Sequence, residues 1–169
     1  MKVELTTVDD TVELGRRLAA VLRAGDLVIL DGPLGSGKTV LARGIGVGLG
    51  VRGEVMSPTF VISRVHPADP GRDGRLPLVH VDAYRLGGVP EVDDLDLDAS
   101  MAESVTVVEW GGGLVEGLAA DWLDVSLTPL PGGDGEDEPR VVRLAGQGGR
   151  WSAAAADVQQ ALAGAAGPA

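Results

Sequence analysis

The residues with the clearest chemical potential are eight consecutive ones, residues 32–39, with the sequence GPLGSGKT. They fit the pattern G-x-x-x-x-G-K-[ST] of a phosphate-binding loop and directly follow an apolar, strand-like run at 27–30. In such a loop the glycines let backbone N–H groups turn toward a phosphate, and the following helix adds the positive end of its dipole. Lys38 is expected to reach the β- and γ-phosphates, and the Thr39 hydroxyl to ligate Mg²⁺. The other predicted nucleotide-binding positions in the loop are Leu34, Gly35, Ser36 and Gly37.

Lysine is rare in this chain, which strengthens the interpretation of Lys38. Of 14 basic residues only two are lysines, Lys2 and Lys38. A compact ammonium on a flexible stem suits a phosphate contact, whereas a guanidinium has a different geometry. The alternative is a glycine-rich turn in a chain with 26 glycines. That alternative requires the full motif and its strand–loop–helix context to coincide by chance.

Two carboxylates end strand-like segments further along the chain. Asp82 ends the run LVHVD, and Glu109 follows the run VTVV and precedes Trp110 and three glycines. Phosphate-loop enzymes need an acid at the carboxyl end of a strand to hold Mg²⁺. A strand-end Glu before a mobile loop can serve the metal or the attacking water. Taken singly, each acid also fits a structural role, Asp82 as a turn cap and Glu109 as a strand edge.

Two further polar features are less specific. The turn at 57–60, Ser-Pro-Thr-Phe, is interpreted either as ordinary turn chemistry or as a switch-like loop whose hydroxyl meets the γ-phosphate or its metal. The residues alone favour ordinary turn chemistry. His80 is interpreted as a core residue or a support for the metal shell, because no other His lies at ligand spacing.

The elements that must position these residues alternate between strands and helices. Apolar periodicity predicts helices at 7–22 and 39–49 and strands at 2–6, 27–30, 61–65, 78–82, 105–108, 121–127 and 140–144. Thr7 and Asp10 resemble a capping box at the start of the first helix. This alternation indicates an α/β fold. We expect one domain over 1–151, followed by an Ala/Gly-rich helix or tail over 152–169.

Composition restricts the possible functions. The chain has no Cys, which excludes thiolate metal sites and Cys nucleophiles, and no Asn, which excludes guanine recognition by N-K-x-D. A net charge of −11 opposes tight, direct nucleic-acid binding. Neither a signal-like start nor an apolar run of membrane-spanning length is present, so we expect a cytoplasmic protein that does not contact the membrane.

Four stretches together resemble the bacterial TsaE family, also called YjeE: GPLGSGKT, SPTF (57–60), HVDAYRL (80–86) and VVEWG (107–111). The members of that family are small ATPases needed for the threonylcarbamoyladenosine modification of tRNA. The resemblance implies a three-layer, P-loop NTPase-like sandwich with a central mixed, mostly parallel sheet. It also implies ATP and Mg²⁺ as ligands, hydrolysis of ATP that is slow alone and stimulated by partners, and function alongside the TsaD and TsaB proteins.

The resemblance carries roles to individual residues. Lys38 and Thr39 correspond to the residues that hold phosphates and Mg²⁺, and Asp82 and Glu109 to carboxylates of the nucleotide–metal site. Lys38, Asp82 and Glu109 are therefore the expected catalytic residues, and Thr39, Asp82 and Glu109 the expected metal ligands. Thr59 and Trp110 are expected to matter for activity at the nucleotide. The family commonly has Pro after Glu-Trp, and the glycines here, 111–113, predict a looser loop.

Two other functions remain compatible with the sequence. A small-molecule kinase would use the same loop but needs a basic lid, for which Arg72 and Arg75 are thin candidates. A nucleotide-dependent scaffold with negligible turnover would look the same in sequence. Acceptor-dependent ADP formation would distinguish the kinase, and turnover would distinguish the scaffold.

Overall fold

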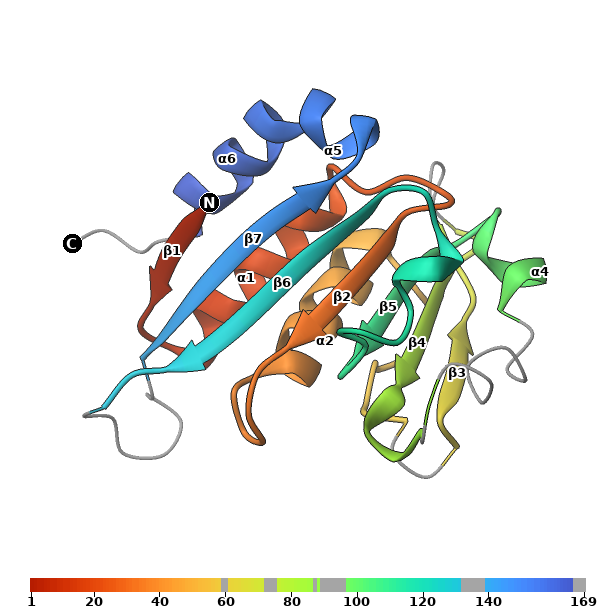
Figure 1. Ribbon diagram of the computed structural model, residues 1–169, viewed down its shortest axis with the longest axis horizontal. Coiled ribbons are helices and arrows are strands. Elements are labelled where there is room, and N and C mark those ends of the chain that lie inside the picture. Colours follow the sequence, from red (N-terminus) through yellow and green to blue (C-terminus); the bar gives the residue numbers. More distant parts are fainter. Residues whose placement is uncertain (59–60, 72–75, 87, 89–96, 132–138, 166–169) are drawn as a thin grey trace.

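The computed structural model describes residues 1–58, 61–71, 76–86, 88, 97–131 and 139–165. Within these residues, seven strands form one sheet in the order β1-β7-β6-β2-β5-β4-β3 (Figure 1). The strands are β1 (Lys2–Leu5), β2 (Leu27–Asp31), β3 (Ser63–His66), β4 (Leu78–Asp82), β5 (Val105–Glu109), β6 (Trp122–Pro129) and β7 (Arg140–Gln147). The helices are α1 (Val8–Ala19), α2 (Lys38–Leu49), α4 (Asp98–Met101), α5 (Gly149–Ala153) and α6 (Ala155–Ala163), with short 3-10 turns η1 (Ala83–Arg85) and η2 (Glu116–Leu118).

The sheet is mixed, with a parallel centre. Strands β6, β2, β5 and β4 pair in parallel, whereas β7, β1 and β3 pair antiparallel with their neighbours. The central strands β2, β4 and β5 are almost wholly buried, which explains their continuous apolar sequences. By contrast, β6 alternates buried and half-buried residues, as expected of a strand covered mainly on one face. The predicted α/β fold with a mixed sheet is confirmed.

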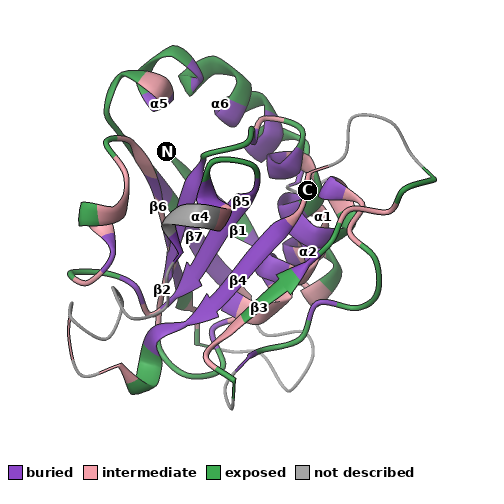
Figure 2. Cartoon of the chain, turned by 90° about the vertical axis from the view of Figure 1, so that its right-hand side faces the viewer, coloured by how far each residue is buried: buried purple, intermediate pink, exposed green. Residues whose placement is uncertain are grey.

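Alternate residues of the central strands enter two separate cores. In β2, Val28 and Leu30 pack with apolar residues of α1 and α2, whereas Leu27 and Ile29 pack on the opposite face with Met101 of α4. This alternation follows from the two-residue repeat of a strand. Figure 2 shows β2, β4 and β5 buried, and β3 and the outer sides of α5 and α6 largely exposed. Because β2, β5 and β4 run parallel, their carboxyl ends lie at one edge of the sheet.

Helices α1 and α2 lie side by side on one face of the sheet, and their backbones approach closely (Figure 1). A Cβ on Gly44 of α2 would lie 2.3 Å from the Val12 carbonyl oxygen, and one on Gly15 of α1 would lie 2.5 Å from the Leu41 oxygen. Each helical glycine costs about 1 kcal/mol relative to Ala. Here that cost is offset by close packing of α1 against α2. This packing fixes the direction of α2, whose first residue is Lys38.

The start of α1 was readable from the sequence, because Thr7 and Asp10 form a capping box. The Thr7 hydroxyl accepts a hydrogen bond from the Asp10 N–H at 3.0 Å, and the Asp10 carboxylate accepts from the Thr7 N–H at 2.9 Å. Burial is the largest single influence on the pKa of Asp10 and raises it, but hydrogen bonds from Thr6 and Thr7 together lower this pKa below its ordinary value.

The last described residues form α5 and α6, which pack on the same core as α1. Trp151, Val158 and Leu162 are buried in the cluster that also contains Leu14 and Leu18. The domain boundary placed after residue 151 stays a prediction. None of the helices in the described part of the chain combines the length and apolarity needed to cross a membrane.

Candidate functional site

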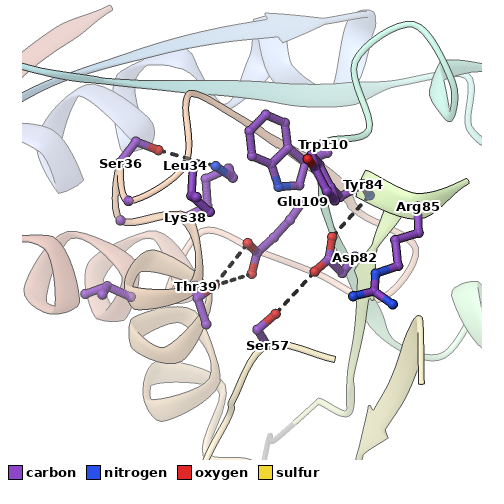
Figure 3. A pocket seen from close by; sticks show the side chains of 13 residues that line it. Leu34, Ser36, Lys38, Thr39, Ser57, Asp82, Tyr84, Arg85, Glu109 and Trp110 are labelled. Atoms are coloured by element: carbon purple, nitrogen blue, oxygen red, sulfur yellow. Dashed lines mark hydrogen bonds between the residues drawn. The ribbon is translucent and has the colours of Figure 1, made fainter. Parts of the chain in front are cut away.

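One pocket of 480 Å³ lies at the carboxyl ends of β2, β4 and β5 (Figure 3). It is lined by residues 34–39 of the loop and by Val40, Ser57, Asp82, Tyr84, Arg85, Glu109 and Trp110. The structure thus brings together nine of the ten predicted site residues: Leu34, Gly35, Ser36, Gly37, Lys38, Thr39, Asp82, Glu109 and Trp110. The tenth, Thr59, lies outside the described residues.

The loop between β2 and α2 has the backbone of a phosphate cradle. Gly35 and Gly37 have φ angles of 79° and 98°, a region that favours glycine, and α2 begins directly after Gly37. Arg140 of β7 lies against the loop, where its Nη1 donates to the Ser36 carbonyl oxygen at 3.3 Å. A Cβ on Gly37 would lie 2.2 Å from that Nη1. Gly37 is therefore favoured by its backbone conformation, and a side chain at this position would displace the Arg140 guanidinium.

Lys38 bends back over its own loop (Figure 3). Its Nζ donates to the carbonyl oxygens of Gly32 at 2.7 Å and Pro33 at 2.9 Å. The same Nζ lies 3.7 Å from the centre of the Trp110 ring, at cation–π distance. The ammonium is therefore held at the mouth of the loop between carbonyl oxygens and an aromatic face.

The charge of Lys38 is held in a partly desolvated place. Burial lowers the pKa of Lys38, against the opposing effect of three carboxylates, Glu109, Asp31 and Asp82. Desolvation disfavours the ammonium, and neighbouring negative charge favours it. A further negative group brought next to Nζ, such as a phosphate, would favour the charged form in the same way.

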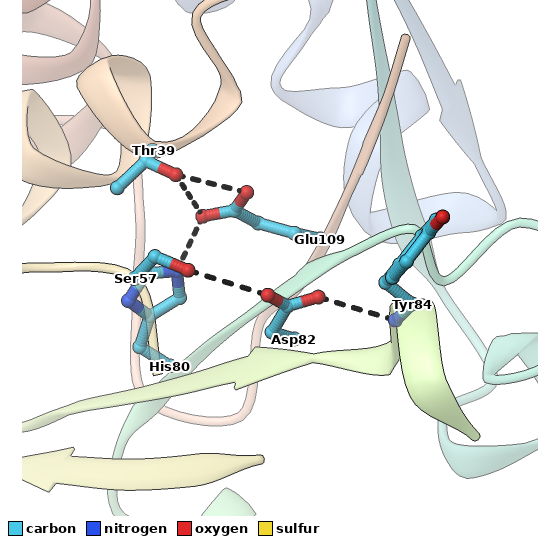
Figure 4. A network of polar contacts seen from close by, with 6 residues as sticks. All are labelled: Thr39, Ser57, His80, Asp82, Tyr84 and Glu109. Carbon is cyan, nitrogen blue, oxygen red and sulfur yellow. Dashed lines mark hydrogen bonds and ion pairs between the residues drawn. The ribbon is translucent and has the colours of Figure 1, made fainter. Parts of the chain in front are cut away.

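Thr39 and Glu109 are joined directly (Figure 4). The Thr39 hydroxyl donates to the Glu109 carboxylate, with Oγ1 2.8 Å from Oε1 and 3.0 Å from Oε2. Nε2 of His80 lies 2.9 Å from the same Oε1. Since the hydroxyl proton points at the carboxylate, the lone pairs of the Thr39 oxygen stay available to a cation.

Asp82 is held by two other groups. It lies opposite Glu109 in the register of β4 and β5, so both side chains reach the same edge of the sheet. One oxygen accepts from the backbone N–H of Tyr84 at 3.1 Å, and the other accepts from the Ser57 hydroxyl at 3.2 Å. Asp82 is also the N-cap of η1. The cap and the pocket position predicted for Asp82 are therefore combined in one side chain.

The oxygen ligands in this pocket suit Mg²⁺. The described part of the chain holds no group of three or more His, Asp or Glu side chains able to enclose a metal ion. Thr39, Asp82 and Glu109 instead offer one hydroxyl and two carboxylates around the phosphate loop. Mg²⁺ is commonly bound by one or two carboxylates together with water and substrate phosphates, so this set fits it.

Comparison with known proteins identifies the family. Residues 5–132 match the sequence model of the family described as threonylcarbamoyl adenosine biosynthesis protein TsaE. The chain belongs to the TsaE family. A tRNA threonylcarbamoyladenosine biosynthesis protein TsaE of Streptomyces coelicolor is 61% identical over 143 residues, covering 84% of this chain and 94% of the relative. A TsaE protein of Bacillus subtilis is 33% identical over 152 residues, covering 89% of each chain.

The fold agrees with that family. The crystal structure of Bacillus subtilis YdiB superimposes with a TM-score of 0.68 and 27% sequence identity, over 95% of this chain and 94% of that one. The resemblance to TsaE inferred from four short motifs is confirmed over most of the chain. The role of this chain therefore lies in tRNA threonylcarbamoyladenosine biosynthesis.

In this TsaE-family chain the first residues after Glu109 make close contacts, whereas Gly113 is exposed and a Cβ there would meet no atom within 4 Å. Trp110 has a φ of 61°, a left-handed conformation that is strained for a bulky residue, and its ring lies 5.2 Å from that of Tyr84. A Cβ on Gly111 would lie 2.8 Å from Val115 Cγ2, and one on Gly112 would lie 2.5 Å from Asp31 Oδ2. These glycines are needed for close approach.

Sequence reasoning did not assign several residues that line or support the TsaE-family pocket: Ser57, Tyr84, Arg85, Arg140 and Asp31. Ser57 belongs to the Ser-Pro-Thr-Phe turn, in which the family resemblance indicates Thr59 and not Ser57. Tyr84 and Arg85 follow Asp82 within the HVDAYRL motif. Arg140 gave no signal, because it is 104 residues from Ser36 and a charged residue at the start of a strand is ordinary.

Proposed function

We propose that this chain binds ATP and Mg²⁺ in the pocket and hydrolyses ATP to ADP and phosphate. The observation that carries the proposal is the convergence of a phosphate loop, a hydroxyl and two carboxylates, Thr39, Asp82 and Glu109, at one edge of the sheet. Hydrolysis by the chain alone is slow, and the TsaD and TsaB proteins stimulate it. The reaction takes place in the cytoplasm.

The residues divide the work by their chemistry. The loop backbone over 34–37 and the ammonium of Lys38 bind the phosphates of ATP and spread charge away from the γ-phosphate. Thr39, Asp82 and Glu109 hold Mg²⁺, which neutralises charge on the phosphates when bound. Ser57 and Trp110 line the pocket, and the loop at 57–60 or the loop at 109–113 changes on hydrolysis. That change is passed to a partner protein.

The chemistry on the tRNA belongs to the partners in this proposal. A net charge of −11 offers a tRNA backbone few favourable contacts, since nucleic-acid affinity depends on neutralising phosphates with Lys and Arg. The pocket itself holds the cation Lys38 among carboxylates, which suits a small Mg²⁺-bound anion. The chain therefore supports the modification by using ATP, without tight direct binding to nucleic acid.

The proposal is tested by measuring phosphate release from ATP by the purified chain, with Mg²⁺ and with excess chelator, in the presence and absence of TsaD and TsaB. We expect slow, Mg²⁺-dependent hydrolysis that rises when both partners are added. Fast hydrolysis that ignores the partners would contradict the partner role. Tight Mg²⁺–ATP binding without measurable hydrolysis under any condition would identify a scaffold, and ADP formation that requires a small acceptor would identify a kinase.

Glu109→Ala separates a role in turnover from a role in binding. We expect hydrolysis to fall by about a hundredfold, while the affinity for ATP changes much less, because a group acting on water or on the developing charge works mainly in the transition state. Affinity is measured with a fluorescent ATP analogue and turnover by phosphate release. An equal loss of both would make Glu109 a ground-state ligand only.

A further inference from the structure

The two histidines of the chain and Glu109 form a buried row across three neighbouring strands. In the register of the sheet, His80 of β4 lies opposite Val107 of β5, two residues before Glu109. On its other side His80 lies opposite Arg64 of β3, two residues before His66. Side chains two residues apart share one face of a sheet, so His66, His80 and Glu109 are diagonal neighbours on the face covered by α2.

All three side chains are removed from water. The relative exposures of His66, His80 and Glu109 are 5%, 0% and 3%. The rings of His66 and His80 lie 6.5 Å apart, and burial, followed by the charges of His80 and Arg64, lowers the pKa of His66. The polar contact of His80 is directed away from His66, toward Glu109.

Among the described residues, the imidazole ring of His80 makes one hydrogen bond, to the Glu109 carboxylate in the pocket. Its Nε2 lies 2.9 Å from Glu109 Oε1, and because a carboxylate accepts, Nε2 carries the proton. Its buried Nδ1 has no hydrogen-bond partner in the described part of the chain. A histidine with one nitrogen unpaired is a poor core residue, because burying a polar atom without a hydrogen bond costs free energy. Two residues earlier on the same face of β4, the buried position is occupied by Leu78. The contact with Glu109 is what distinguishes His80 from an ordinary core side chain.

We propose that His80 is a positioning residue that holds the Glu109 carboxylate against Thr39. This inference rests on the proposed function of the pocket. With Oε1 held by the imidazole, the carboxylate faces the Thr39 hydroxyl with both oxygens, at 2.8 and 3.0 Å. The hydroxyl proton is thereby directed to Glu109 and the oxygen lone pairs of Thr39 are left for Mg²⁺. His80 acts through Glu109 and does not itself touch ATP or the metal.

The arrangement around Asp82 supports this assignment, because each carboxylate of the pocket has its own support. Asp82 is held by the Ser57 hydroxyl and the Tyr84 N–H, at the start of a 3-10 turn. Glu109 ends β5 and is held by Thr39 and His80. Removing the support of a metal-binding carboxylate commonly costs about 10- to 100-fold in metal affinity or activity.

The test compares His80→Leu, His80→Gln and Thr106→Val. Leu fills the space without a donor, whereas the side-chain amide of Gln presents an N–H close to the position of the imidazole Nε2. Thr106→Val is the matched control, because Thr106 is also fully buried in the sheet and carries an unpaired polar atom, but its side chain lies on the opposite face. Phosphate release gives kcat and KM, and a fluorescent ATP analogue gives nucleotide affinity with and without Mg²⁺.

We expect His80→Leu to lower kcat about 10- to 100-fold and to raise the Mg²⁺ concentration needed for half-maximal activity, while Mg²⁺-free nucleotide affinity stays within about threefold. His80→Gln should recover at least tenfold of the lost kcat, and Thr106→Val should match the unmutated chain. Normal kcat and Mg²⁺ dependence in His80→Leu would overturn the proposal. Equal losses in the Leu and Gln variants would do so as well, since they would indicate a packing role.

The proposed function and this inference fail in different ways. If the unmutated chain binds Mg²⁺–ATP but does not hydrolyse it, ATP turnover as the function is wrong. The role of His80 is then read from binding: His80→Leu must lose the gain in nucleotide affinity that Mg²⁺ provides, and His80→Gln must restore it. Retention of the full gain in His80→Leu, or absence of any Mg²⁺-dependent gain in the unmutated chain, would reject the positioning role.

Discussion

The two ends of strand β2 both carry buried charge, but they are built differently. Asp26, which precedes β2, is matched by Arg150 of α5: the guanidinium donates to both carboxylate oxygens, at 3.1 and 2.8 Å. Arg150 also donates to the Val21 carbonyl oxygen at 2.7 Å, and the Arg23 N–H donates to Asp26. In this contact the Arg150 guanidinium is paired with the Asp26 carboxylate and a carbonyl oxygen. The ion pair joins α5 to the start of β2.

At the carboxyl end of β2 the charges are arranged differently. Three carboxylates, Asp31, Asp82 and Glu109, act on the one ammonium of Lys38, which itself donates to backbone carbonyl oxygens. The carboxylates are held by neutral donors, including the Gly112 N–H, the Ser57 and Thr39 hydroxyls and the His80 ring. The Asp26–Arg150 contact at the amino end of β2 is suited to stabilising the fold. The carboxyl end of β2 is suited to binding a cation and an anion together.

The largest expected effect tests the carboxyl end. Lys38→Ala should lower ATP hydrolysis by about 10²–10³-fold, because an ammonium aimed at developing phosphate charge commonly contributes that much. The melting temperature should change by no more than a few degrees, since burial already disfavours the charge of Lys38. The matched control is Lys2→Ala, which removes the other lysine of the chain. Lys2 is exposed and forms an ion pair with Glu4. Near-normal hydrolysis by Lys38→Ala would reject the assignment of the loop.

An intermediate effect tests the amino end, on stability alone. Arg150→Ala leaves the buried Asp26 without its partner and should lower the free energy of unfolding by about 2–3 kcal/mol. For a chain of this size that corresponds to a fall of roughly 5–10 °C in melting temperature. Hydrolysis measured well below that temperature should be unchanged. Arg143→Ala, at an exposed position of β7, should leave the melting temperature within about 1 °C.

The smallest effect concerns Asp31, at the end of β2. Burial raises the pKa of Asp31 above its ordinary value of 3.8. The hydrogen bond from the Gly112 N–H opposes this rise, and the negative charges of Asp124 and Glu116 add to it. When the pKa of a carboxyl is higher in the folded than in the unfolded protein, the folded protein loses stability as the pH rises from the unfolded pKa through the folded pKa. Asp31→Asn, which keeps an acceptor for Gly112, should therefore raise the melting temperature at pH 7 by roughly 1–3 °C.

The sign of the Asp31 effect is checked by pH. Below pH 3.8 the carboxyl is protonated in both states, so the advantage of Asn should shrink toward zero in thermal melts at low pH. A gain that is independent of pH would mean that the substitution acts through packing against Gly112. A loss of stability at pH 7 would mean that the charge of Asp31 is needed beside Lys38.

Several parts of the site could be predicted because their residues are contiguous. The loop over 32–39 combines glycines, Lys38 and Thr39 in a pattern whose geometry is local, and Thr7 and Asp10 announced the start of α1 in the same way. Asp82 and Glu109 could be proposed because each follows an apolar run that reads as a buried strand. Even their meeting could be expected, since parallel strands bring their carboxyl ends to one edge.

Other parts could not be predicted, because they depend on contacts between distant segments. Arg140 supports the loop from a strand more than a hundred residues later, and the strand order places β2 between β5 and β6. His80 could be assigned to a core or supporting role, but only the register between β4 and β5 brings its ring to Glu109. The contacts of Gly111 with Val115 and of Gly112 with Asp31 likewise join residues that the sequence pattern does not connect, while the looser loop expected after Trp110 stays a prediction.

The local elements, the phosphate loop and the family could be predicted from the residues alone, because periodicity, capping and contiguous motifs are properties of neighbouring residues. The carboxylate that faces Thr39, the ring that supports it and the arginine that contacts the loop are set by the three-dimensional arrangement of the strands. Those relations depend on strand order and register, which are set by the simultaneous burial of two apolar faces on either side of one sheet. A shift of one residue between β4 and β5 would turn His80 or Glu109 to the opposite face and take the pocket apart.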